Sequence, residues 1–154
     1  MALERDIDRL AAQPLLGLMP REALRLLAFA AEARMVRAGD VLFRRNQASD
    51  GAFLVAAGRI ALDERDDGSP TDIVVGPGAL IGEMALFVEG PRPATAVVRE
   101  NGSVLKLPRT LMLRVLGEFP ETAAALHRAI SARVAGLSDE IEDVRLRYLD
   151  AGPN

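Results

Sequence analysis

The residue types that build most reactive or metal-binding sites are absent or scarce in this sequence. There is no Cys and only one His among 154 residues. Without Cys the chain can form no disulfide, iron–sulfur cluster or thiolate zinc site, and a single His excludes a site built from several histidines. The sequence also shows no nucleophile–base pair. We therefore expect no metal, no cofactor and no catalytic residue.

Long hydrophobic runs and a strong excess of one charge are missing too. The first ten residues, MALERDIDRL, alternate charges with Leu and Ile and lack the apolar region of a signal peptide. No apolar run approaches the length needed to cross a bilayer. The net charge is −3 and no basic stretch dominates, which argues against a nucleic-acid partner. We expect a soluble, cytoplasmic protein with no membrane or nucleic-acid contact.

What is present is typical of one globular domain. Hydrophobic residues make up 49% of the chain and charged residues 27%, which indicates a folded protein. The length suits a single domain over residues 1–154. The pattern divides this domain into a helical lead over 1–34, strands over 35–108 and helices over 109–150.

The helical lead carries one apolar stripe. Pro20 suits the first turn of a helix. Leu24, Leu27, Ala28 and Ala31 follow at spacings that place them on one helix face. We interpret this stripe as core packing.

Short apolar pieces separated by turn residues fill the middle of the chain. Asn101-Gly102 predicts a hairpin, because this pair tolerates the positive φ of a type I′ turn. Many short strands at this spacing indicate a compact sandwich or a rolled barrel. The expected strands are Val41–Phe43, Phe53–Val55, Ile60–Leu62, Ile73–Val75, Thr95–Val98 and Val104–Leu107.

The C-terminal part returns to helical spacing. A short helix is expected over about 110–116, and Pro120 starts a longer one. Apolar residues in the longer helix form a heptad seam. The seam consists of Ile130, Val134, Leu137, Ile141, Val144 and Tyr148. It packs either on the strands of its own chain or against a second copy, and we predict a homodimer through this helix.

The stretch GEMALFVEGPRPATA at residues 82–96 places Glu83 and Arg92 in apolar surroundings. A buried charge is costly unless it is paired. Glu83 and Arg92 could form an ion pair with each other. They could instead serve an anionic ligand that carries a ribose, with Arg92 on a phosphate, backbone N–H groups of residues 82–85 beside it, and the Glu83 carboxylate on a sugar hydroxyl.

This stretch resembles the phosphate-binding cassette of the cyclic-nucleotide-binding domain. Catabolite activator proteins, kinase A regulatory subunits and cyclic-nucleotide-gated channels share that domain. The resemblance is carried by GEMAL and PR-x-AT, by GDVLFRRNQASDGAFLVAAG at residues 39–58, with Gly39, Phe43, Asp50 and Gly58, and by GPGALIGE at residues 76–83. It implies an α+β fold, in which an antiparallel β-roll of the double-stranded jelly-roll type is flanked by N-terminal helices and a long C-terminal helix.

The resemblance also implies which residues hold the ligand. Arg92 would bind the cyclic phosphate, Glu83 would bind the ribose 2′-hydroxyl, and the backbone at the start of the cassette would complete the cradle. The expected ligand-binding residues are Gly82, Glu83, Met84, Ala85, Arg92, Pro93, Ala94 and Thr95, with Arg133, Leu137 and Ser138 of the final helix covering the base.

Two residues depart from the family's pattern. Asn46 stands at a tight turn where Gly is usual, and Asn is the next-best residue for left-handed backbone. Pro93 has no N–H, although the residue after the Arg normally donates one to the phosphate. Because a hydrogen bond to a charged group is worth about 1.5–3 kcal/mol, we expect binding to be about tenfold to a hundredfold weaker.

Three functions remain open. The first is a cyclic-nucleotide sensor for cAMP or cGMP, without a DNA-binding or catalytic part of its own, because the chain ends soon after the long helix. Such a sensor would act through a downstream protein that the sequence does not identify. The second is an interaction or dimerisation module that kept the fold and lost the nucleotide, and Pro93 supports it. An enzyme comes third, since no catalytic set is visible.

Overall fold

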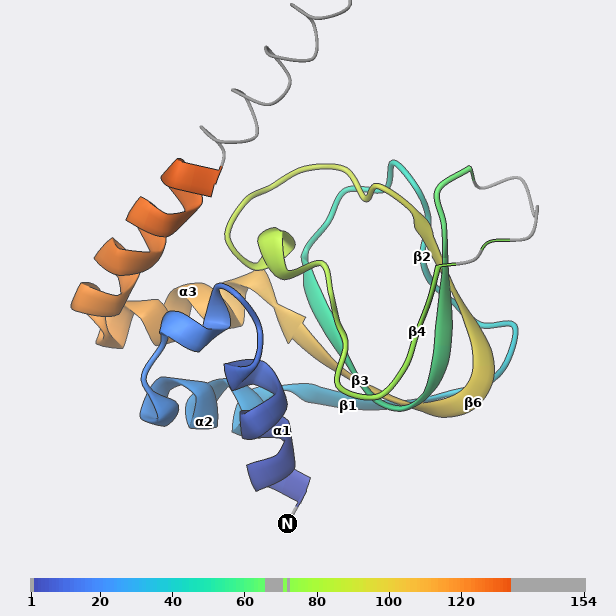
Figure 1. Ribbon diagram of the computed structural model, residues 1–154, viewed down its shortest axis with the longest axis horizontal. Coiled ribbons are helices and arrows are strands. Elements are labelled where there is room, and N and C mark those ends of the chain that lie inside the picture. The colour runs from blue at the N-terminus through green and yellow to red at the C-terminus, as the bar shows by residue number, and fades with distance from the viewer. Residues whose placement is uncertain (1, 66–70, 72, 134–154) are drawn as a thin grey trace, which may run out of the picture.

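The structure, a computed structural model, describes residues 2–65, 71 and 73–133. Helices gather beside a roll of antiparallel strands (Figure 1). The elements are α1 (Ala2–Ala11), the 3-10 turn η1 (Leu16–Leu18), α2 (Arg21–Ala30), β1 (Glu32–Val36), β2 (Val41–Phe43), β3 (Gly51–Asp63), β4 (Val74–Val75), β5 (Leu80–Ile81), the 3-10 turn η2 (Glu83–Leu86), β6 (Thr95–Pro108) and α3 (Arg109–Glu118). Residues 120–133 are also helical. The predicted α+β fold with an antiparallel β-roll is confirmed.

The N-terminal helices end earlier than the sequence pattern predicted. The expected helical lead reached residue 34, but α2 ends at Ala30 and β1 follows directly. β1 pairs with β6, and Glu32 lies opposite Lys106. Pairing with a distant strand therefore outweighs the local preference of this segment for helix. The start of α2 is right to within one residue, because Pro20 immediately precedes it.

Strand β6 is the centre of the sheet. It spans 14 residues and pairs with β1, β2 and β3, while β3 also pairs with β4 and β5. The predicted hairpin at Asn101-Gly102 is wrong, because both residues lie within β6. The apolar pieces that were expected to form separate strands on either side of Ala57 likewise belong to one strand, β3.

Gly102 is required for a close contact between strands and not for the turn that the sequence predicted. A Cβ added to it would lie 1.9 Å from the carbonyl oxygen of Ala57 on β3. The pairing register between β3 and β6 shifts on both sides of Ala57. Gly102 thus allows two strands to approach closely at a bulge, and the side chain of Asn101 accepts a hydrogen bond from the backbone of Ala38 (2.8 Å).

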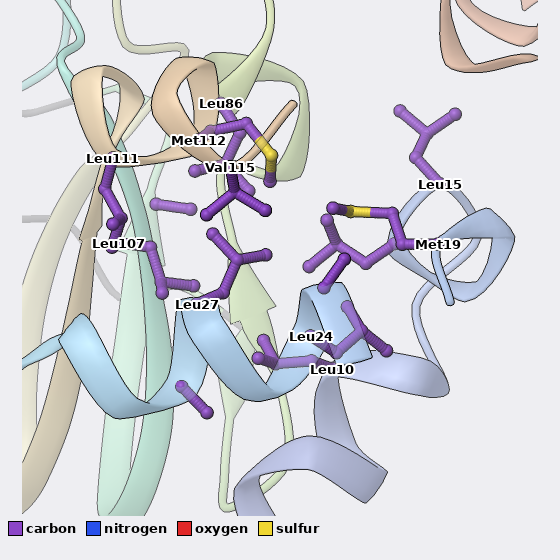
Figure 2. Close-up of a cluster of buried hydrophobic side chains, with 14 of the residues drawn as sticks. Leu10, Leu15, Met19, Leu24, Leu27, Leu86, Leu107, Leu111, Met112 and Val115 are labelled. Carbon is purple, nitrogen blue, oxygen red and sulfur yellow. The ribbon is translucent and has the colours of Figure 1, made fainter. Parts of the chain in front are cut away.

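Two buried hydrophobic clusters hold the fold together. The helical cluster joins α1, α2 and α3, and Leu24, Leu27 and Ala28 of the predicted stripe belong to it. Leu86 of η2 also belongs to this cluster and lies near α3 (Figure 2). The roll cluster lies between the strands and includes Phe43. The turn η2 therefore bridges the helices and the roll, as its central place in the ribbon shows (Figure 1).

The C-terminal helices begin as predicted. α3 contains the expected helix over 110–116, and helical structure resumes at Pro120. Ile130, the first residue of the heptad seam, packs against the helical cluster. The rest of the seam, from Val134 to Tyr148, lies outside the described residues. Within the described ranges, no helix is long and apolar enough to span a bilayer.

Candidate functional site

The turn η2 begins at a glycine that the site requires. Gly82 is the N-cap of η2 and has φ 82°, in the left-handed region that favours glycine. A Cβ on Gly82 would lie 2.7 Å from Nη1 of Arg92. At the other end, Leu86 is fully buried in the helical cluster. One end of η2 is thus anchored in the core, and the other leaves room for a guanidinium.

Arg92 is the only charged residue that is buried in the described part of the chain, with 3% of its surface exposed. Its guanidinium carbon lies 4.2 Å from the centre of the Phe43 ring and 5.9 Å from that of Phe53. Nη2 lies 3.5 Å from the Asp50 carboxylate, and Nε has no hydrogen-bond partner. A buried charged group with an unused donor is unusual in a protein, and an anion beside it would satisfy that donor.

The backbone around Arg92 is fixed by the loop between β2 and β3. The N–H of Arg92 donates to the carbonyl of Gln47, and the N–H of Asn46 donates to the carbonyl of Arg92, each at 2.8 Å. Asn46 has φ 70°, so the expectation that Asn would take a left-handed turn here is confirmed. The two segments hold each other in register.

Burial and neighbouring charges set the electrostatics of the site. Burial lowers the pKa of Arg92, the Asp50 carboxylate opposes this effect, and the nearby charge of Arg109 lowers the pKa further. Arginine still stays protonated. A hydrogen bond from Lys106 (2.8 Å) lowers the pKa of Asp50. Two cations, Arg92 and Lys106, thus lie beside the Asp50 carboxylate, and Arg109 adds a third positive charge near Arg92. The local excess of positive charge favours an anionic ligand.

A cavity of about 200 Å³ lies beside Arg92. The predicted site residues Gly82, Arg92, Pro93 and Ala94 contribute to its wall. The other lining residues are Phe43, Leu62, Val75, Ala79, Leu80 and Ile81. The described wall therefore combines one guanidinium with apolar side chains, which is typical of a small-molecule site.

Glu83 does not belong to this wall, and its partners are not those that the sequence suggested. Oε2 accepts hydrogen bonds from the backbone N–H groups of Leu15 (3.0 Å) and Leu16 (3.2 Å). Oε1 lies 3.7 Å from Nη1 of Arg133. The alternative of a Glu83–Arg92 ion pair is therefore wrong, because each charge has other partners. Glu83 joins η2 to the N-terminal segment and to the final helix.

The remaining predicted residues have structural contacts. Met84 packs against the helical cluster, and the carbonyl of Ala85 accepts a hydrogen bond from Arg109. The hydroxyl oxygen of Thr95 accepts one from the backbone of Arg45 (2.9 Å). The expected base-covering residues Leu137 and Ser138 lie outside the described residues.

Sequence reasoning missed Lys106 and Arg109 as parts of the site. Lys106 lies within a strand and gave no signal of its own. Arg109 is the first residue of α3, where a cation is opposed by the helix dipole. That unfavourable position was the one sequence feature that could have pointed to a specific partner for Arg109.

Comparisons with known proteins agree with the fold. Residues 33–119 match the family model for the cyclic nucleotide-binding domain. A cyclic nucleotide-binding-like protein from Brucella abortus is 41% identical, with a TM-score of 0.67 over 73% of this chain and 97% of that one. The N-terminal domain of a Streptomyces coelicolor transcriptional regulator is 31% identical, with a TM-score of 0.74 over 87% of this chain and 95% of that one.

Curated relatives extend the comparison. The lysophospholipase nte1 of Neurospora crassa is 31% identical over an alignment of 147 residues that covers 90% of this chain. The chain spans about a tenth of the length of the curated relatives it matches first. The fold is also that of the regulatory domain of Toxoplasma gondii PKA, solved with cAMP, at 24% identity and a TM-score of 0.66 over 73% of this chain and 44% of that one. This chain belongs to the cyclic nucleotide-binding domain family.

Proposed function

We propose that this chain is a sensor module that binds a 3′,5′-cyclic purine nucleotide, cAMP or cGMP, and has no catalysis of its own. The observation that carries the proposal is the buried Arg92 side chain, whose Nε lacks a partner and whose guanidinium lies at the cavity wall. A cyclic phosphate beside Arg92 would supply the missing acceptor. The aromatic rings of Phe43 and Phe53 lie close to the guanidinium and help to hold it in place.

The size of the cavity suggests how the nucleotide is placed. Its volume of about 200 Å³ is below the roughly 300–1,000 Å³ usual for ligand pockets. We expect the phosphate and ribose inside the cavity and the base at its rim. The output would pass to a downstream partner, in the cytoplasm, through the final helix. A homodimer through that helix is part of the same proposal.

Calorimetry with cAMP and cGMP, up to millimolar concentration, tests the sensor function. We expect measurable binding to the wild type and a loss of at least about thirtyfold in Arg92→Gln, since removing one partner of a desolvated charge pair costs about 2–5 kcal/mol. Pro93→Ser, which restores an N–H, is expected to tighten binding by up to about a hundredfold. Arg34→Gln, on the exposed face of β1, is the control that leaves binding unchanged. A wild type that binds neither nucleotide refutes the sensor function.

A second candidate function is an interaction module that kept the fold without the nucleotide. Two observations favour it. Pro93 at the cavity wall has no N–H to donate. The Glu83 carboxylate, expected on the ribose, is already held by Leu15 and Leu16. The same calorimetry separates the two candidates, because an interaction module predicts no heat with either nucleotide in the wild type or in Pro93→Ser.

A further inference from the structure

Arg109 does not line the cavity, but its side chain makes several hydrogen bonds to segments near it. Its Nε donates to the carbonyl of Ala85 at 2.8 Å. Its Nη2 lies 2.9 Å from both the carbonyl and the hydroxyl of Ser49, and 3.3 Å from the carbonyl of Val88. One side chain on α3 therefore holds η2, the turn that follows it, and the loop that precedes β3.

The segments that Arg109 joins are the ones that place Arg92. Ser49 belongs to the loop whose backbone bonds to Arg92 through Gln47 and Asn46. The N–H of Ser49 also donates to the carbonyl of Gly90 (2.9 Å), two residues before Arg92. Ala85 lies in η2, and its N–H donates to the carbonyl of Gly82 (2.9 Å), the glycine that lies against the Arg92 guanidinium. Arg109 does not line the cavity, but its hydrogen bonds reach the segment that follows Gly82 and the loop that holds Arg92.

The kind of donor matters as much as its charge. The Arg109 contacts use two different nitrogens of a planar group to reach carbonyls on separate segments. A lysine could supply the charge but could not span those acceptors, because its donors radiate from a single nitrogen. The two roles therefore predict different results for Arg109→Lys. If Arg109 only attracts an anion by its charge, the lysine variant keeps its affinity; if Arg109 positions the segments, the lysine variant loses affinity.

We propose that Arg109 is a positioning residue for the cyclic-nucleotide site. It fixes η2 and the loop before β3 relative to each other, so that Gly82 and Arg92 face the same anion. This inference rests on the proposed function. Arg109 does not touch the ligand, and its effect on affinity passes through the backbone of the segments it holds.

The test compares variants of Arg109 with two controls. Arg109→Gln removes the charge and the planar guanidinium, and Arg109→Lys keeps the charge alone. Arg114→Gln alters an exposed arginine on the same helix. Leu24→Ala lowers stability from within the helical cluster, away from the cavity. Affinity and dissociation rate for cAMP and cGMP are measured well below the unfolding temperature, and amide hydrogen exchange is followed in the ligand-free proteins.

We expect Arg109→Gln and Arg109→Lys to weaken binding by at least about tenfold, the equivalent of one hydrogen bond to a charged group, with faster dissociation. The amides of Phe87 and Val88, which bond to the Met84 carbonyl, are expected to exchange faster in both variants. Arg114→Gln and Leu24→Ala leave affinity unchanged. Normal affinity in Arg109→Lys would show that only charge matters and would overturn the proposal.

Other outcomes are equally decisive. Unchanged exchange at Phe87 and Val88 in both Arg109 variants overturns the proposal, whatever the affinities. A loss of affinity in Leu24→Ala that matches the loss in Arg109→Gln assigns the effect to stability and overturns it too. If the wild type binds neither nucleotide, the proposed sensor function is refuted, and so is the role of Arg109 in nucleotide binding. A wild type that binds, together with normal binding in both Arg109 variants, refutes the role of Arg109 alone.

Discussion

At the scale of single residues, the two charges of the cassette have different environments. Arg92 lies against two aromatic rings, and its Nε keeps an unused donor. The Glu83 carboxylate accepts hydrogen bonds from backbone N–H groups of another segment. The same side chain would have to serve a ribose hydroxyl if the resemblance holds for its role. Occupying the site would then compete with the contact between η2 and the N-terminal segment.

Glu83→Ala separates the ligand role from the structural one. If Glu83 accepts the ribose 2′-hydroxyl, the substitution weakens cAMP binding more than binding of the 2′-deoxy analogue, which lacks that hydroxyl. We also expect the free energy of unfolding to fall by about 1–3 kcal/mol, because the N–H groups of Leu15 and Leu16 lose their acceptor. Calorimetry and urea unfolding measure the two effects. Equal affinity losses for both ligands would remove Glu83 from the ribose.

At the scale of elements, β6 explains why part of the fold could not be predicted from the sequence. Asn101-Gly102 satisfied the local rules for a hairpin, yet the chain continues straight through it. The glycine is needed for a contact with Ala57, a residue 45 positions away, and local patterns carry no information about such contacts. Similarly, β1 is a strand only because β6 lies beside it.

Gly102→Ala tests this explanation. Its Cβ would overlap the Ala57 carbonyl, so the strands would have to separate at the bulge. We expect a loss of about 3 kcal/mol in the free energy of unfolding, measured with urea. Gly90→Ala is a matched control, because nothing lies within 4 Å of a Cβ added there. If Gly102 and Gly90 variants have equal free energies of unfolding, the close approach between Gly102 and Ala57 is contradicted.

The candidate site was predictable to the extent that it rests on local motifs. Gly82 and Arg92 were identified from their spacing and from the family resemblance, and the structure places them in contact. Glu83 contacts Leu15, which is 68 residues away in the sequence, and Arg109 contacts Ala85, which is 24 residues away. Their contacts arise only when the helices pack on the roll, so no spacing rule could have shown them.

At the scale of the whole molecule, the cavity lies against the roll cluster, and η2 connects its edge to the helical cluster. Leu86 links η2 to the helical cluster, while Phe43 and Phe53 beneath Arg92 belong to the roll cluster. We therefore expect a ligand that draws η2 toward Arg92 to shift the helices relative to the roll. Arg133, which lies next to Glu83, would carry that shift into the final helix.

The predicted homodimer concerns the same helix. Ile130 packs within its own chain, and in the sequence the predicted seam continues beyond the described residues. An exposed stripe of that length is unfavourable for a single domain, so we expect a second copy to cover it. Sedimentation of the wild type and of Ile141→Glu tests this, with Glu142→Ala as an off-seam control. A wild type that stays monomeric at high micromolar concentration, unaffected by Ile141→Glu, contradicts dimerisation.

The central position of β6 also bears on how the chain folds. β6 lies late in the sequence, yet it supplies partners to β1, β2 and β3, and Glu32 pairs with a residue 74 positions later. Such long sequence separations raise the contact order and slow folding. During synthesis, β1 and β2 must wait for their partner until residues 95–108 have emerged from the ribosome. This interval is when their exposed edges are most open to aggregation.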